Sequence, residues 1–246
     1  MNINFYCEYH EALEHKPYPI GKVMPEWYKS LQPFFDRTRN NRTVKVCVPF
    51  LDVLSSGYCI PLPVDLKLNR TDDGNLEYDF GMISNQFGET HGGSKFDLDL
   101  GFDIHSSNQY KGMPVPDNHF HVACKFILPW IVTTPPGYSC LFTPPMNRER
   151  KYFEIISGIV DTDKYRGNQN FPCWLKHWDN TKGPFKELLI PAGTPIAHVF
   201  PFKRDNWKMN IDKRPPNYNK DFWKINFFSN WAHNYRNKNW TKKDYK

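Results

Sequence analysis

The sequence predicts a mainly β protein: an antiparallel β-sandwich, jelly-roll or cupin-like barrel with a short N-terminal helix and an aromatic-rich C-terminal helix. The 246 residues include 21 prolines, more than the usual share of about 5%, which indicates many short elements joined by turns. Phe, Trp and Tyr make up 16% of the chain, so a few large rings can build a core although only 39% of residues are hydrophobic. Between the turns, short runs alternate apolar and polar residues, which is typical of half-buried strands.

The N-terminal part predicts one short helix followed by strands. Residues 25–31 begin with a proline, which the first turn of a helix accepts. Residues 43–48 alternate apolar and polar side chains and predict a strand. Residues 64–68 and 76–80 alternate on either side of a turn that contains Asp-Gly, so we expect a β-hairpin there.

The middle of the chain contains short alternating segments and almost no helical pattern. The turn sequences Thr-Pro-Pro-Gly at 134–137 and Ile-Pro-Ala-Gly at 190–193 separate some of them. About eight to ten short strands divided by Pro and Gly turns are typical of an antiparallel sandwich or barrel. The further candidate strands are residues 96–104, 119–125, 126–133, 138–142, 153–160 and 195–202.

The positive charge is concentrated at the C-terminus. The last 44 residues hold 12 Lys and Arg against 4 Asp and Glu, whereas the rest holds 20 against 22. We therefore predict a β-sandwich domain over 1–202 and a basic, aromatic extension over 203–246 that packs on it. Interleaved basic and aromatic residues can also bind single-stranded nucleic acid, but helical spacing favours a packed helix; that spacing is seen in Phe222, Ile225, Phe228, Ala232 and Tyr235.

The N-terminus and the cysteines bear on the cellular compartment. Residues 1–9 have neither the basic nor the apolar region of a secretory signal, and no window approaches the ~18 apolar residues of a membrane span. The six cysteines form no C-x-x-C pair and are expected to be reduced and buried. We expect a cytoplasmic protein without a membrane partner.

A histidine pair is the main candidate for a metal site. His119 and His121 are two apart, so on a strand both imidazoles would face the same side. With His198, or with His105, they could hold Fe(II) or Zn(II) in a cupin-like oxygenase. Lys125 occupies the position where such sites usually place a carboxylate. The alternative is a pair of strand histidines beside a proline-rich loop.

Several loop and ring residues are candidates for ligand binding. Asp161 and Asp163 follow an apolar run and could bind Ca²⁺ or act as acid and base, or they could form an Asp-rich turn. Asn147 follows a double proline and is either presented to a ligand or a turn residue. The rings expected to contact a ligand are Trp130, Trp174 and Trp178, with Tyr138.

One stretch resembles a known family. It runs from FILPWIVTTPPGYSCLFTPPMN at 126–147, through SGIVDTD at 157–163, to IPAGTPIAHVFP at 190–201. This order is similar to an uncharacterised family of tailed phages and bacteria, the domain of unknown function 6065. The resemblance covers residues 126–201, and its most specific part is 158–163. It implies a compact β-domain of phage origin and brings no activity with it. With a phage source, the expected location is the host cell cytoplasm or the virion.

Three functions follow from these observations. The first is a non-catalytic protein that binds a small molecule or a protein partner through its proline-rich loops and rings. The second is the cupin-like, metal-dependent oxygenase. The third is a virion-associated structural protein whose basic tail is an assembly arm. A homo-oligomer is compatible with each of them, and any nucleic-acid binding would involve only the tail.

Overall fold

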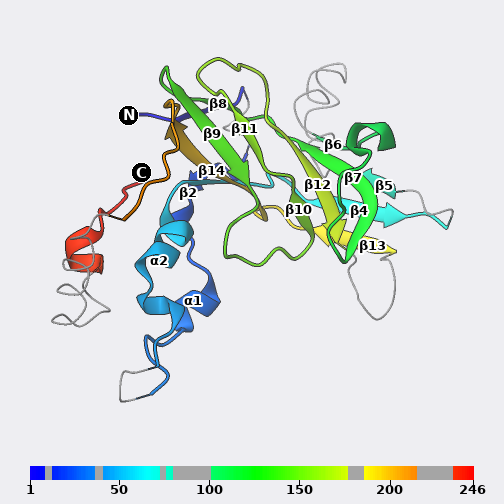
Figure 1. The fold of residues 1–246 in the computed structure, drawn as a ribbon. Coiled ribbons are helices and arrows are strands. Elements are labelled where there is room, and N and C mark those ends of the chain that lie inside the picture. The colour runs from blue at the N-terminus through cyan, green and yellow to red at the C-terminus, as the bar shows by residue number, and fades with distance from the viewer. Residues whose placement is uncertain (9–12, 37–40, 73–75, 80–100, 177–185, 215–234) are drawn as a thin grey trace. The chain divides into compact units, whose positions relative to one another are not determined.

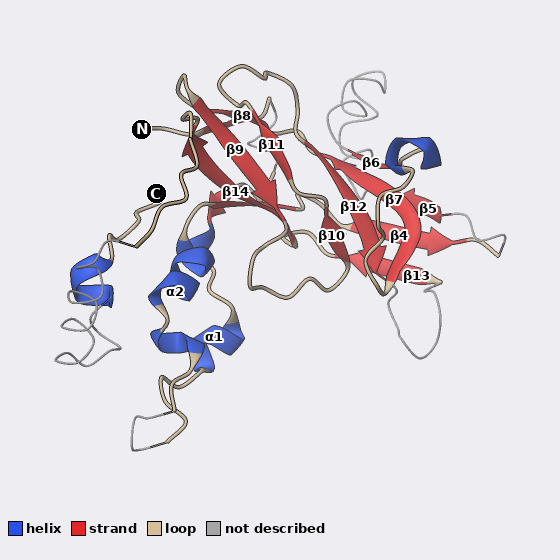
Figure 2. Cartoon of the chain, viewed as in Figure 1, coloured by secondary structure: helices blue, strands red, loops and turns tan. Residues whose placement is uncertain are grey.

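The computed structural model describes residues 1–8, 13–36, 41–72, 76–79, 101–176, 186–214 and 235–246. The protein is mainly β, as the sequence predicts, with several antiparallel sheets and few helices (Figure 2). The chain forms two compact units, which are described separately below. The first unit contains residues 1–18 and 57–203, and the second contains residues 19–56 and 204–246.

The first unit contains four sheets (Figure 1). The five-stranded sheet has the order β11 (Gly158–Val160), β9 (Tyr138–Thr143), β14 (Pro195–Lys203), β3 (Tyr58–Pro61), β2 (Tyr18–Pro19). The four-stranded sheet has the order β10 (Phe153–Ile155), β12 (Asn170–Lys176), β7 (His119–Ile127), β6 (Gly101–Ile104). The two smaller sheets are β13 (Glu187–Ile190), β4 (Leu66–Arg70), β5 (Leu76–Asp79) and the pair β1 (Asn4–Tyr6), β8 (Ile131–Thr133).

Side chains that alternate along β7 show how the core forms. Cys124 and Phe126 point into the core, whereas Lys125 between them lies on the other face and pairs with Asp103. The register places Phe126 between Phe102 of β6 and Phe171 of β12. Burying one such ring contributes roughly 2–3 kcal/mol. A row of aromatic side chains across three antiparallel strands is therefore a main source of stability in this sheet.

The second unit contains short helices: η2 (Ile20–Lys22), α1 (Glu26–Ser30), η3 (Val44–Val46), α2 (Val48–Ser55) and the π-helical turn η5 (Tyr235–Asn239). The rings of Tyr28 and Phe50 are stacked with their centroids 6.2 Å apart. The Lys45 ammonium lies 4.5 Å from the Tyr28 ring centroid and donates to the Tyr28 carbonyl at 2.6 Å. Ring stacking and single hydrogen bonds connect these helices.

Local predictions were confirmed where a turn or cap determines the element. Pro25 precedes α1, as expected for the helix at 25–31. Strands β4 and β5 form the predicted hairpin, with Arg70 opposite Leu76. The candidate strands at 138–142 and 195–202 correspond to β9 and β14. Of the run 96–104, only residues 101–104 are described, and they form β6.

The strand predicted at residues 43–48 is wrong, because these residues form η3 and the start of α2. The Thr43 side chain accepts from the Lys45 N–H and caps the 3₁₀ turn, and Pro49 stands in the first turn of α2, where no N–H is needed. The run 153–160 is divided between β10 and β11, which belong to different sheets. The sequence patterns missed β12 altogether.

The C-terminal extension is described at its two ends, 203–214 and 235–246. Most of the predicted aromatic helix, from Phe222 to Ala232, lies outside the described residues, and its last member Tyr235 begins η5. The extension groups with residues 19–56 in the second unit. The division at residue 203 stays a prediction. Among the described residues, no helix has the length and apolar character needed to cross a membrane.

Candidate ligand-binding site

A cavity of about 210 Å³ lies in the first unit between two proline-containing segments. One wall comes from the connection between β9 and β10, and the other comes from the β13–β14 turn and the start of β14. The first wall contributes Pro144, Pro145, Glu149, Arg150, Lys151, Tyr152, Phe153 and Ile155. The second contributes Pro191, Thr194, Pro195 and Ile196. The cavity is therefore built by segments about 40 residues apart in the sequence.

The second wall is a rigid turn. Gly193 adopts a φ of 81°, a left-handed conformation that favours glycine. Its N–H donates to the Leu62 carbonyl at 2.8 Å, and the Leu62 N–H donates to the Thr194 carbonyl at 2.8 Å. The Asp65 carboxylate accepts from the Ala192 N–H at 2.7 Å. These bonds connect the turn to the segment after β3, so this wall is formed before any ligand arrives.

Charged side chains of the first wall lie beside an apolar floor. Phe153, Ile155 and Ile196 are buried and provide the floor. Arg150 donates to the Glu154 carboxylate at 2.7 Å, and the Lys151 ammonium lies 5.2 Å from the Tyr152 ring centroid. The Arg150 guanidinium has five N–H donors, so the ion pair with Glu154 does not use all of them.

The backbone below these charges is also fixed. The Lys176 ammonium, from β12, donates to the Arg150 carbonyl at 2.6 Å. The Lys176 N–H donates to the Tyr152 carbonyl at 2.9 Å. Two bonds from one residue of β12 therefore hold the segment that carries Arg150 and Lys151. The sequence patterns did not predict Arg150, Lys151 or Tyr152 as site residues. The basic run Arg-Glu-Arg-Lys at 148–151, shortly after a double proline, was a signal that could have indicated them.

Asn147 lies in the first wall segment, beyond the two buried prolines. It is exposed and has a φ of 56°, a left-handed conformation that asparagine tolerates better than most residues. Asn147 itself does not line the cavity. Its conformation turns the chain so that the next residues, from Glu149 onward, form the cavity wall.

Asp161 and Asp163 form a turn that holds two strands together. The Ser139 hydroxyl donates to the Asp161 carboxylate at 2.7 Å, and the Gly137 N–H donates to the Asp163 carboxylate at 2.8 Å. The buried Thr162 between them shares a 2.7 Å hydrogen bond with Thr134. The carboxylates accept hydrogen bonds from the β8–β9 turn and the start of β9, as in the turn alternative considered for the sequence.

The predicted ligand-contacting tryptophans lie in the core or outside the described residues, and Tyr138 is half-buried in β9 and does not line the cavity. Trp130 is 3% exposed and belongs to the main core cluster. Trp174 is 2% exposed and packs edge-on against Tyr110, with ring centroids 5.2 Å apart. Trp178 lies outside the described residues. The aromatic ring that lines the cavity edge is Tyr152.

The three candidate metal ligands are not brought together. His119 and His121 are on β7, but His119 is buried and His121 is exposed, whereas His198 is buried in β14 of another sheet. His119 Nδ1 lies 2.8 Å from the Asp117 carbonyl, so Nδ1 carries the proton. Within the described part of the chain, no group of three or more His, Cys, Asp or Glu residues could hold a metal ion. His105 interacts with Gln109 instead.

The buried thiols are unsuited to nucleophilic chemistry. Burial raises the pKa of Cys59 to about 11, and a hydrogen bond with Tyr18 lowers it only in part. Burial likewise raises the pKa of Cys140 to about 11 and that of Cys124 to about 12. A thiol must ionise to attack. These three cysteines therefore stay protonated near neutral pH, as expected for structural core residues.

No protein-family model matches this chain, and no curated protein matches it significantly. Among solved structures, the chain matches a mutant dUTPase from phage phi11 of S. aureus, a structure that describes the coordination of a structural Mg(II) ion. The two are 12% identical with a TM-score of 0.25, and the match covers 47% of this chain and 99% of that chain. Such a likeness is too distant to assign a function. The resemblance to the phage family stays a prediction.

Proposed function

We propose that this chain is a non-catalytic binding protein and that its ligand occupies the cavity between the β9–β10 connection and the β13–β14 turn. The observation that carries the proposal is the cavity itself, with a floor of buried apolar side chains and a wall fixed by hydrogen bonds. Sites for small molecules are typically preformed, mostly apolar hollows with a few polar groups that orient the ligand. Its volume of about 210 Å³ suits a small ligand.

The lining favours a small acid with an apolar body. Among the described residues, the lining carries the bases Arg150 and Lys151 and the acid Glu149. A carboxylate can accept from a guanidinium or an ammonium, while the ligand body contacts the proline rings and Tyr152. Arg150 pairs with Glu154, and the Lys151 ammonium lies 5.2 Å from the ring centroid of Tyr152, which also lines the cavity. A ligand body that contacts Tyr152 would therefore bring its carboxylate near Lys151.

The two other functions lack an equivalent observation. A cupin-like oxygenase needs three ligands around one metal, and His119, His121 and His198 do not converge in the structure. A virion-associated role rests on the basic tail alone. Both stay predictions from the sequence.

A ligand-observed NMR titration tests the binding proposal with benzoate and, as its neutral counterpart, benzyl alcohol. We expect benzoate to bind more tightly, and Lys151→Glu to weaken benzoate about tenfold, the equivalent of about 1.4 kcal/mol. Lys151 is exposed, so the substitution leaves the core intact. Lys111→Glu, another exposed lysine of the first unit away from the cavity, is the matched control and should leave benzoate binding unchanged. Equal affinities for the two probes, or equal weakening by both variants, would contradict an anion site here.

A further inference from the structure

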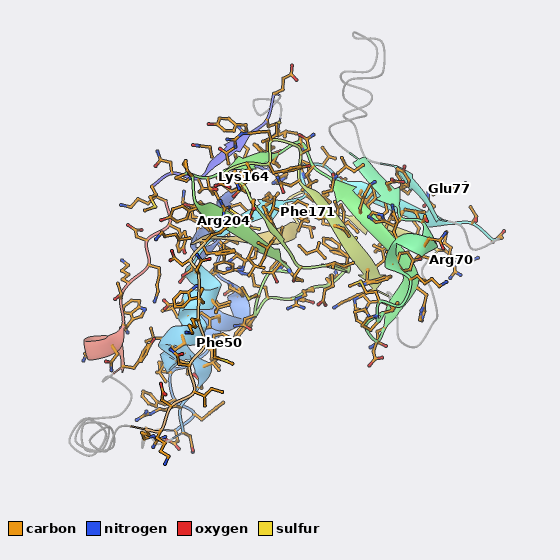
Figure 3. All side chains as sticks on the ribbon, turned by 45° about the horizontal axis from the view of Figure 1, so that its top comes forward. Phe50, Arg70, Glu77, Lys164, Phe171 and Arg204 are labelled. Carbon is orange, nitrogen blue, oxygen red and sulfur yellow. The ribbon has the colours of Figure 1, made fainter. Side chains whose placement is uncertain are left out.

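Residues 206–213 leave three large apolar side chains in water. Trp207 is 90% exposed, Met209 is 82% exposed and Ile211 is 87% exposed. A single exposed apolar residue is ordinary, but a contiguous group marks a surface that another molecule covers. The segment follows β14 closely in the chain, and Figure 3 labels Arg204, which lies between the end of β14 and this segment.

The spacing of these side chains is that of a strand. Trp207, Met209 and Ile211 are two apart, and Lys208 and Asn210 stand between them. In an extended chain this places the apolar side chains on one face and the polar ones on the other. Residues 206–213 nevertheless belong to no helix or strand in the structure. The segment therefore has the sequence pattern of a half-buried strand but is not paired in a sheet.

A matching surface lies on the five-stranded sheet of the first unit. Among the described residues, strand β11 is at the edge of that sheet and pairs with β9 on one side only. The register aligns Ile159 of β11 with Leu141 of β9, and Leu141 with Phe200 of β14. We call these three residues the apolar row. Ile159 is 65% exposed, and Leu141 and Phe200 are half-buried.

The apolar row lies on the sheet face opposite to the core. The neighbouring positions Cys140 and Phe142 of β9 point into the core cluster, so Leu141 between them points away from it. Phe202, two residues beyond Phe200, is 37% exposed. An open edge strand with an apolar face is a template for pairing with another chain.

We propose that residues 206–213 of one copy of this chain add as a strand to the β11 edge of a second copy, with Trp207, Met209 and Ile211 against the apolar row. Strand addition provides the backbone pairing, and side chains of one face provide the specificity. Both surfaces are present in every copy, so reciprocal exchange between two copies covers all of them in a closed pair. This association is independent of the ligand proposed above.

Charge supports the same pairing. Residues 204–214 carry four bases and two acids. The exposed Asp161 follows β11 directly and ends the edge strand with a carboxylate. A positively charged segment next to this carboxylate adds a modest attraction, because exposed ion pairs contribute only about 0–1 kcal/mol. Most of the association energy therefore comes from the apolar side chains.

Cross-linking between two differently labelled copies tests the geometry. In a Cys47→Ser background, which removes an exposed thiol, Met209→Cys protein is mixed with Ile159→Cys protein and treated with a short bis-maleimide. We expect a cross-linked dimer that contains one chain of each kind. Asn210→Cys, on the opposite face of the segment, is the matched control and should cross-link far less. A chain carrying both Met209→Cys and Ile159→Cys that cross-links only within itself would overturn the proposal.

Light scattering on eluted fractions provides the second test. The protein should form a dimer whose population falls on dilution, and Trp207→Ser with Ile211→Ser should shift it to monomer. Both replaced side chains are almost fully exposed, so folding is preserved. Ile159→Asp should have the same effect from the receiving side, and Lys208→Ser with Asp212→Ser should have none. A monomer at every concentration, or a dimer that survives both apolar variants, would refute the exchange.

Discussion

The two units of this protein are stabilised in different ways. Every member of the main core cluster belongs to the first unit, where apolar side chains from several sheets pack together. The second unit buries few apolar side chains among its described residues: Ile20, Tyr28, Val48 and Leu54. The stability of the first unit therefore depends on buried apolar area. The second depends on a small number of ring contacts and on polar bonds to particular residues.

The difference follows from the lengths of the elements. Strands of up to nine residues, paired on both sides, let each inward side chain contact several neighbours. Helices α1 and α2 have five and eight residues, which is too short for independent stability. Short helices are stable only through contacts with particular side chains. In the second unit, single side chains therefore contribute more to stability than their buried area suggests.

The largest expected effect comes from the core of the first unit. Phe126 is fully buried, with ring centroids 4.6 Å from Phe153 and 5.2 Å from Phe102. Phe126→Ala should lower the free energy of unfolding by about 3–5 kcal/mol, because it removes a buried ring and leaves a cavity. Phe50→Ala in the second unit is the comparison. Because the Phe50 ring is only half-buried, its removal should lower the free energy of unfolding by about 1–2 kcal/mol. Urea unfolding measures both, and equal losses would contradict the difference between the units.

The next effect compares one glycine from each unit. Gly57 has a φ of 85°, and an added Cβ would lie 2.5 Å from the Val199 carbonyl oxygen. Gly57→Ala should lower the free energy of unfolding by about 2–4 kcal/mol. The loss comes from the strain of a left-handed backbone conformation and from displacement of the β14 backbone. At Gly21 an added Cβ would lie 2.8 Å from the Ser55 carbonyl oxygen, without an unfavourable φ, so Gly21→Ala should cost less.

A third glycine separates the two causes. Gly112 has a φ of 82°, but no atom of the described residues lies within 4 Å of an added Cβ. Gly112→Ala should therefore show the conformational cost alone, about 1–2 kcal/mol. Thermal unfolding of the three variants tests the order, and a Gly112→Ala cost as large as that of Gly57→Ala would show that the contact with Val199 contributes nothing.

Features determined by neighbouring residues were predictable from the sequence. The Asp-Gly turn determines the β4–β5 hairpin, and Pro25 begins α1. The alternation at 43–48 led to a wrong strand prediction, because a capped 3₁₀ turn followed by a helix can have the same alternating pattern. Strand β12 was missed because Trp174, between the buried Cys173 and Leu175, is buried as well, so the run 173–175 does not alternate. Such a strand resembles any short apolar run.

The candidate site could be predicted only in part. The proline-rich turns at 144–145 and 190–193 were visible in the sequence, and both contribute to the cavity. Their proximity depends on the order of strands in the sheets, which local patterns do not encode. The same limit explains the tryptophans, because a sequence does not show that Tyr110 covers Trp174 or that Trp130 faces the core.

In the second unit, one carboxylate should have a local effect of intermediate size. Asp52 accepts from the Trp240 indole N–H at 3.0 Å and from the Lys243 ammonium at 2.7 Å. Asp52→Ala should destabilise the residues around η5 by about 1.5 kcal/mol, because hydrogen bonds to a charged group are lost. Hydrogen exchange across residues 235–246 measures the effect. Asp244→Ala, which removes an exposed ion pair with Lys246, is the control and should change exchange little.

The smallest effect is a pH dependence in the first unit. A hydrogen bond from Lys125, 3.0 Å away, is the main cause that lowers the pKa of Asp103, and burial opposes it. A carboxyl group whose pKa is lowered on folding stabilises the protein above its unfolded pKa, near 3.9. That contribution is lost as the pH falls through the lower folded value.

Asp103→Asn should therefore lower the free energy of unfolding slightly at neutral pH. In acid, the variant and the parent protein should have equal stability. Because both side chains are partly exposed, added salt should shrink the difference at neutral pH. Urea midpoints at neutral and acidic pH, with and without salt, measure it, and a difference that grows toward acid would contradict the ion pair.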